Sequence, residues 1–180
     1  MKIFGIDPGT ATTGWAVVEE KNLTSSRSAG FQRMNKNPHL IACGCINTSN
    51  LKTDAERLVE IGKDINSLIK KYQPTEAAIE DLFFFKNFKT AITVAQARGV
   101  ILYKIKKNKI PLFAYTPLQV KQALTGYGRA EKKQIQKMIK NILRLKRVPK
   151  PDDAADAAAI AICHLNSRRM KHEIWSKENS

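Results

Sequence analysis

The chain has 180 residues, of which 43% are hydrophobic and 26% are charged, a balance typical of a globular protein with one core. Its 31 Lys and Arg outnumber 16 Asp and Glu, so the formal net charge is +15 and nucleic acid is the first partner to consider. No apolar run is long enough to span a bilayer and no signal-peptide pattern is visible, so we expect a cytoplasmic protein. The three cysteines lack the spacing of a zinc site and are expected to be reduced.

Three short strands are predicted in the first part of the chain. Residues 2–7 and 13–19 have the apolar content of strands and are separated by a Pro-Gly turn. Residues 40–47 predict a third strand. The stretch 20–38 between the second and third strands is polar, so we expect it to be a loop insertion.

The rest of the chain predicts helices and strands in alternation. In chain order the patterns predict a helix from Thr53 or Asp54 to Gln73, a strand over 76–80, a helix over 87–107, a strand over 110–115, a helix after Thr116, a basic amphipathic helix over 130–146, and a final helix over 152–165. The first three strands can form an antiparallel meander, whereas the later ones need crossovers. The predicted fold class is therefore α/β with a mixed sheet.

The basic residues are concentrated in one part of the sequence. From Leu82 to Pro151 the single acid is Glu131, among seventeen Lys and Arg. A scattered solvated surface would not separate its charges in this way. A long basic segment bordered by acids is what a nuclease needs, since it must bind a polyanion and also cut it.

Two of the predicted strands end on an acid. Residues 2–7 end at Asp7 and residues 76–80 end at Glu80. Taken alone, Asp7 could equally well begin the Asp-Pro-Gly turn. If the two strands are parallel neighbours, however, their carboxylates lie side by side at the edge where open α/β sheets bind ligands.

A second pair of acids begins the final helix. Asp153 and Asp156 stand three residues apart, so both face one side of that helix. Asp152 is four residues before Asp156, and geometry alone does not separate it from Asp153. Because it follows Pro151 directly, Asp152 is predicted to be the N-cap of the helix.

Four carboxylates in one place are typical of metal-dependent phosphoryl transfer. Hard divalent cations take oxygen ligands, and two of them about 4 Å apart can hold the attacking and leaving oxygens of a phosphodiester. Several clustered acids repel one another in the absence of a cation. The alternative, four unrelated surface acids, is weakened because three of them adjoin apolar strands or an alanine-rich helix.

Six motifs in register resemble one family. In chain order they are "GIDPGTATTGWAVV", "AIEDLFFFKN", "AQARGV", "TPLQVKQALTGYG", "AEKKQIQ" and "DDAADAAAIAICH". The sequence from about Lys2 to Leu165 resembles the RuvC family of Holliday-junction resolvases, and the 20–38 loop is longer than usual for that family. The resemblance implies a ribonuclease-H-like fold over residues 1–167, with a five-stranded mixed sheet flanked by helices. Residues 168–180 match no family pattern and are expected to be a disordered basic tail.

The resemblance also implies roles for individual residues. The catalytic and metal-binding carboxylates of the family fall on Asp7, Glu80, Asp153 and Asp156. The family's DNA-binding positions fall on Phe83, Lys121 and Lys132: Phe83 would stack on open bases at the junction, while the two lysines would lie near the scissile phosphate and backbone. The alternative for Phe83 is a buried place in the core.

The implied activity is cleavage of four-way DNA junctions during recombination and repair. It would proceed by paired nicks in opposed strands that leave 5′-phosphate and 3′-hydroxyl ends, with two Mg²⁺ ions per site and Mn²⁺ as a substitute. The implied partners are a second copy of the chain, in a homodimer, and the RuvA–RuvB branch-migration complex of the bacterial cytoplasm. A non-catalytic module that binds branched DNA is the alternative function. An actin-like ATPase fits less well, because no second Asp-x-Gly hairpin follows.

Overall fold

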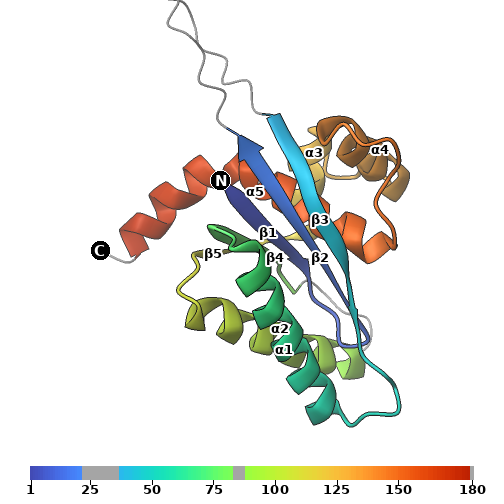
Figure 1. Cartoon of the computed structure of the whole chain (residues 1–180). Helices are drawn as coiled ribbons and strands as arrows, with labels where there is room; N and C mark the ends of the chain where they lie inside the picture. The colour runs from blue at the N-terminus through green and yellow to red at the C-terminus, as the bar shows by residue number, and fades with distance from the viewer. Residues whose placement is uncertain (22–36, 83–87, 179–180) are drawn as a thin grey trace, which may run out of the picture.

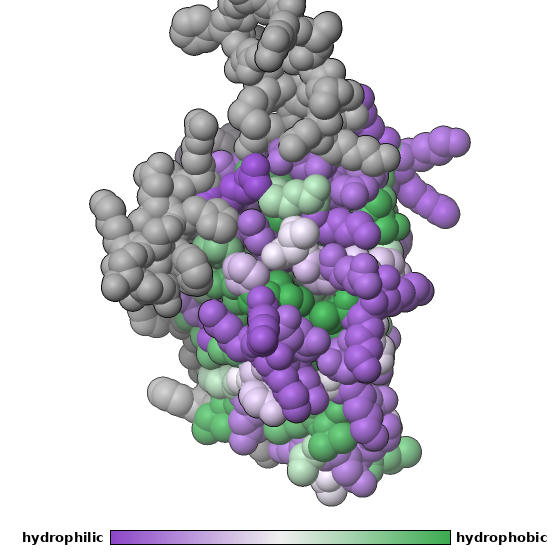
Figure 2. Space-filling view, turned by 60° about the vertical axis from the view of Figure 1, so that its left-hand side comes forward, coloured by the Kyte–Doolittle hydropathy of each residue, from purple (hydrophilic) through white to green (hydrophobic). Residues whose placement is uncertain are grey.

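The computed structural model describes residues 1–21, 37–82 and 88–178 (Figure 1). Its centre is a five-stranded sheet with helices on both faces. Hydrophilic residues make up most of the coloured surface in Figure 2, and hydrophobic residues form smaller patches between them. In the part of the chain that the structure describes, no helix is long and apolar enough to cross a membrane.

The sheet has the strand order β3-β2-β1-β4-β5. β1 (Lys2–Asp7), β2 (Thr12–Lys21) and β3 (Asn37–Asn47) form an antiparallel meander. β4 (Glu76–Glu80) pairs in parallel with β1, and β5 (Leu112–Tyr115) pairs in parallel with β4. The sheet is therefore mixed, and the predicted meander and crossovers are confirmed.

Five helices cover the two faces of this sheet in the described part of the chain. They are α1 (Asp54–Tyr72), α2 (Phe88–Lys107), α3 (Pro117–Thr125), α4 (Lys132–Ile142) and α5 (Asp152–Glu178). β1 is buried on both sides, because Phe4 and Ile6 pack towards α1 and α2 while Ile3 packs towards α3, α4 and α5. This central position explains why the strand sequence is almost continuously apolar.

α5 lies unusually close to the sheet because glycines face it. A Cβ atom on Gly5 of β1 would be 2.1 Å from the backbone oxygen of Ala157, and one on Gly14 of β2 would be 2.1 Å from that of Asp153. No side chain fits in either place, so only glycine allows this approach. The first turns of α5 are thereby held directly over β1 and β2.

A buried histidine, His164, links α5 to β4 and β5. The Tyr115 hydroxyl lies 2.7 Å from Nδ1 of His164, and Nε2 lies 2.6 Å from the Glu76 carboxylate. Burial raises the pKa of Tyr115, so its hydroxyl keeps its proton, and Nε2 of His164 donates to the Glu76 carboxylate. This network satisfies polar groups that would be costly to bury unpaired.

Several predicted boundaries differ from those observed. The second and third strands extend further than predicted, to Lys21 and from Asn37, and residues 22–36 of the expected loop insertion lie outside the described residues. The helix predicted over 130–146 is shorter, Lys132–Ile142.

The end of the chain also differs from the prediction. The backbone of α5 continues to Glu178, where a disordered tail was expected from residue 168. The sequence from Asp152 to Glu178 contains no Gly or Pro, so nothing in it ends the helix after the buried segment.

Candidate active site

The acids that end β1 and β4 meet as predicted. The two strands are parallel neighbours with Ile6 opposite Ile79, so Asp7 and Glu80 follow at the same edge of the sheet. The two carboxyl groups lie close enough for each to affect the pKa of the other. Burial at the end of two central strands makes this edge an expensive place for charge.

The acids of α5 complete the cluster. Asp153 and Asp156 lie in the first turns of that helix, which Gly14 allows to approach the sheet. Both carboxylates are close enough to Asp7 to raise its pKa by repulsion. Four acids that are distant in the sequence therefore lie in one place.

Burial and repulsion together make this cluster unfavourable for full ionisation. Burial raises the pKa of Asp7 to about 8, and Glu80, Asp156 and Asp153 contribute in that order. Burial also raises the pKa of Glu80 and of Asp156. Raised carboxyl pKa values in a cluster of acids are a feature of functional sites.

The donor chemistry of this cluster fits a hard divalent cation. All four side chains offer carboxylate oxygens, the ligands that Mg²⁺ and Mn²⁺ prefer, and a cation would offset the repulsion that helps to raise the pKa of Asp7 and of Glu80. As the side chains stand, no group of three or more His, Cys, Asp or Glu in the described part of the chain is arranged to hold a metal ion. The fit therefore rests on the donor set and its electrostatics.

Lys132 is the cation of the cluster in this structure. Its Nζ atom lies 3.1 Å from Oδ2 of Asp152 and 3.3 Å from Oδ2 of Asp156. Partial burial lowers the pKa of Lys132, but the hydrogen bonds and charges of the two aspartates outweigh this effect and raise it overall. Lys132 stays charged and neutralises part of the acidic cluster.

The predicted N-cap role of Asp152 is wrong. The helix begins at Asp152 itself, so this residue lies within the first turn. Its carboxylate binds Lys132 through one oxygen and accepts a hydrogen bond from Nε2 of Gln136 through the other, at 3.3 Å. The side chain is thus directed towards α4.

The lysines and two of the acids share a pocket of about 260 Å³. Glu80, Asp156, Lys121 and Lys132 contribute its polar lining, and apolar residues of α3, α4 and α5 form the rest. The structure therefore brings both predicted DNA-binding lysines to the carboxylates. Phe83, the third predicted DNA-binding residue, lies outside the described residues.

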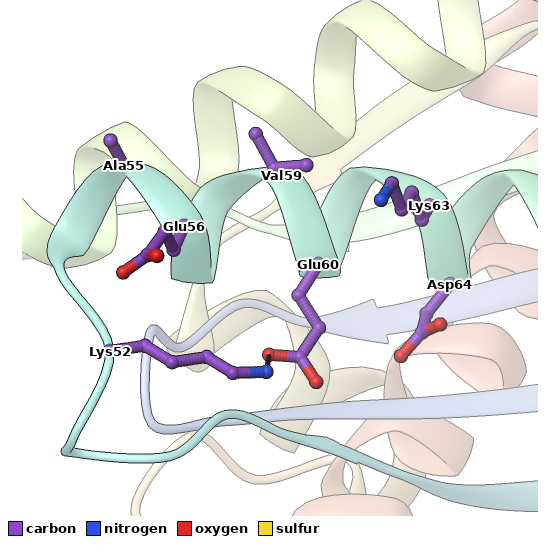
Figure 3. A pocket seen from close by; sticks show the side chains of 7 residues that line it. All are labelled: Lys52, Ala55, Glu56, Val59, Glu60, Lys63 and Asp64. Carbon is purple, nitrogen blue, oxygen red and sulfur yellow. Dashed lines mark hydrogen bonds and ion pairs between the residues drawn. The ribbon is translucent and has the colours of Figure 1, made fainter.

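A larger pocket, of about 580 Å³, is unrelated to these groups. It lies along α1, between Lys52 and Asp64, on the opposite face of the sheet (Figure 3). Lys52 reaches along it to bind Glu60 at 2.8 Å. Its lining comes from α1 and from Lys52, two residues before that helix, and its acids all belong to this one helix. The smaller pocket, where acids from separate elements meet, is therefore the candidate active site.

Sequence reasoning missed two residues that support the site. Arg98 of α2 donates from Nη2 to the Asp81 carboxylate at 2.9 Å and from Nε to the backbone oxygen of Glu80 at 3.3 Å, so it holds the end of β4. The motif "AQARGV" contained this arginine but did not show its partner. Burial raises the pKa of the Cys45 thiol on β3, and the nearby Asp153 carboxylate adds to this effect.

The sheet order and the acids at its central edge define a class of protein. A five-stranded mixed sheet with a meander followed by two parallel strands, flanked by helices on both faces, is the ribonuclease-H-like fold, as predicted. The crystal structure of Thermus thermophilus RuvC superposes with a TM-score of 0.82 and 33% sequence identity, and the match covers 95% of this chain and 97% of that one. T. thermophilus RuvC in complex with a Holliday junction substrate gives a TM-score of 0.81 at 30% identity, with 94% and 96% covered.

The sequence comparisons then give the family. The family model for crossover junction endodeoxyribonuclease RuvC matches residues 3–164. The protein of that name from Roseiflexus sp. is 49% identical over 173 residues, which cover 96% of this chain and 95% of that protein. The chain belongs to the RuvC family of crossover junction endodeoxyribonucleases. The predicted family, fold and class of enzyme, a DNA endonuclease, are confirmed.

Proposed function

We propose that this chain resolves four-way DNA junctions by metal-dependent nicking, with Asp7, Glu80, Asp153 and Asp156 as its catalytic, metal-binding carboxylates. The main support is the convergence of these four acids from β1, β4 and α5 beside Lys132. Nicking in two opposed strands, with 5′-phosphate and 3′-hydroxyl ends, is the activity that the family implies.

The cation is Mg²⁺, with two ions per site and Mn²⁺ as a substitute. Asp7, Glu80, Asp153 and Asp156 would hold it, and it would supply Lewis-acid activation of a water molecule and charge stabilisation for the leaving oxygen of the phosphodiester. The protein supplies the oxygen ligands and orients them through the edge of the sheet and the first turns of α5. The buried Asp7 has to lose its proton before it can act as an anionic ligand.

The basic residues around the pocket bind the DNA. Lys121 and Lys132 line the pocket next to Glu80 and Asp156, where a phosphate brought to the carboxylates would meet them. Phe83 stacks on an open base at the junction, since it follows the end of β4 by three residues. The seventeen Lys and Arg between Leu82 and Pro151 supply further phosphate contacts.

Cleavage of two opposed strands requires two sites, so the active form is a homodimer. It works with the RuvA–RuvB branch-migration complex in the bacterial cytoplasm. Residues 1–167 form the nuclease domain, and the part of α5 beyond it is an extension.

The test is single-turnover nicking of a synthetic four-way junction beside a linear duplex of the same sequence. We expect paired nicks in the junction with Mg²⁺ or Mn²⁺, little cutting of the duplex, and binding without efficient cutting in Ca²⁺. Asp153→Asn should leave the melting temperature close to that of the parent and remove nearly all cleavage. Equal cutting of both substrates, or full activity in EDTA, would rule out the proposal.

A further inference from the structure

The proposed site includes a fifth acid that the four-carboxylate set does not explain. Asp152 is 59% exposed in its side chain and binds Lys132, which is 53% exposed. Ion pairs this exposed contribute little to folding stability. The role of the Asp152–Lys132 ion pair must therefore lie in the position that it gives to the lysine ammonium group.

Three contacts define the position of the Lys132 ammonium group. It lies between Asp152 and Asp156, at 3.1 and 3.3 Å, and Gln136 holds the other oxygen of Asp152 at 3.3 Å. Lys132 and Gln136 are one turn apart on α4, so both reach the same carboxylate from one face of that helix. Asp152 thus fixes the start of α4 against the start of α5.

We propose that Asp152 is a positioning residue that holds Lys132 at the mouth of the active site. The proposal rests on the proposed function, because Asp156 is there a metal ligand. When a cation occupies Asp156, Lys132 loses that partner but keeps Asp152. Its ammonium group then remains beside the pocket, in place for a DNA phosphate.

The same geometry predicts what happens without Asp152. Of the two ion pairs of Lys132, only the one with Asp156 is left. The ammonium group then competes with the metal ion for that carboxylate. A neutral residue at position 152 should therefore weaken metal binding through Lys132, in addition to the plain loss of one negative charge.

A double-mutant cycle separates these two effects. Ca²⁺ affinity is measured by calorimetry, without DNA, for the parent, Asp152→Asn, Lys132→Met and the double variant. We expect Asp152→Asn to weaken Ca²⁺ binding more in the parent than in Lys132→Met, with a coupling of about threefold or more. Equal effects in both backgrounds would show that Asp152 acts only as a charge, and would overturn the proposal.

Nicking provides the second measurement. Asp152→Asn should slow single-turnover nicking about tenfold, the usual effect of a residue that orients a ligand, while junction affinity stays the same or rises. Gln136→Met should change nicking in the same direction by less, because Asp152 keeps its charge. Asp64→Asn removes a similar exposed carboxylate from α1 and should have no effect.

The outcomes of the two measurements are distinct. An Asp152→Asn protein that nicks like the parent overturns the positioning role. A parent that does not nick junctions overturns the proposed function, and the Ca²⁺ cycle still decides whether Asp152 acts through Lys132.

Discussion

At the scale of single residues, Asp7 shows how unfavourable a negative charge is at this site. It ends the most central strand, where burial and three neighbouring acids raise the pKa of its carboxyl to about 8. An ordinary aspartate would be ionised at neutral pH, whereas this one keeps its proton in the absence of a cation. The residue is costly for the fold, and the proposed cation would reduce that cost.

This protonation makes the stability of the metal-free protein depend on pH. The folded pKa of Asp7, about 8, lies above the ordinary value of 3.8, so the folded state binds more protons between these values. Stability is then lost as pH rises through that window. Asp7→Asn removes this loss and should be more stable than the parent at pH 8, by about 1.4 kcal/mol for each pKa unit of the shift.

Urea unfolding in EDTA at pH 5 and pH 8 checks this prediction. The stability difference between Asp7→Asn and the parent should grow from pH 5 to pH 8. A difference that stays constant would show that the Asp7 pKa is not raised. Nicking by the variant should be lost at both pH values.

At the scale of elements, the contact of α5 with the sheet determines whether the four acids of the site lie together. Two acids come from strand ends and two from this helix, so a small shift of α5 separates the pairs. The helix is placed by glycines in β1 and β2 and by its own run of alanines, all buried from Ala157 to Ala159. Small side chains are used here because they allow the backbones to approach.

Gly14→Ala tests this contact. Its Cβ atom would be 2.1 Å from the backbone oxygen of Asp153, so the first turn of α5 must move. We expect a loss of about 1–3 kcal/mol in the free energy of unfolding, as for other overpacked positions, and a strong fall in single-turnover nicking. Gel-shift affinity for the junction should be affected less than nicking.

Gly99→Ala is the matched control. A Cβ atom on Gly99, which is exposed on α2, would have nothing within 4 Å. This change should stabilise the protein by about 0.5–1 kcal/mol, because alanine is the better helix former, and should leave nicking unchanged. Similar destabilisation by both substitutions would contradict the close-contact explanation.

At the scale of the whole molecule, acids and bases are separated in a way that suits a nuclease. The net charge of +15 attracts a polyanion, while the carboxylates that repel it are gathered at one edge of the sheet. Lys121 and Lys132 lie where the two regions meet. The basic field brings DNA to a site that would otherwise repel it.

Junction binding should therefore weaken steeply with salt. Each neutralised phosphate contributes about −0.9 to the slope of log affinity against log salt, so about six neutralised phosphates lower the affinity about 1,000-fold between about 50 and 200 mM salt. Replacing Lys133 and Lys137, both exposed on α4, by Gln should make the slope shallower by about 0.9 for each phosphate that is no longer neutralised. Filter binding across a salt series measures this slope for the parent and for the double variant.

The matched control for the salt dependence is a pair of lysine substitutions on α1. Lys70→Gln and Lys71→Gln remove the same charge from the end of a helix on the opposite face of the sheet. If these changes reduce the slope as much as those on α4, binding depends on net charge and not on the basic segment.

The sequence by itself determined the features whose signals are local. Strand and helix types, the start of α1 at Thr53 or Asp54, and the two acids at strand ends all follow from patterns within a few residues. The similarity of six motifs identified the family, and it predicts the four carboxylates of the proposed site. Boundaries were less accurate because pairing with a neighbouring strand, as at Lys21 and Asn37, extends a strand beyond its own apolar pattern.

Only the tertiary structure decided which side chains meet. Asp152 binds Lys132 and not its own helix end, Arg98 holds the end of β4, and His164 is buried against Glu76. The sequence separations of these pairs range from 18 residues for Glu80 with Arg98 to 88 for Glu76 with His164. Such pairs depend on how helices pack on the sheet, and local periodicity contains no information about that packing.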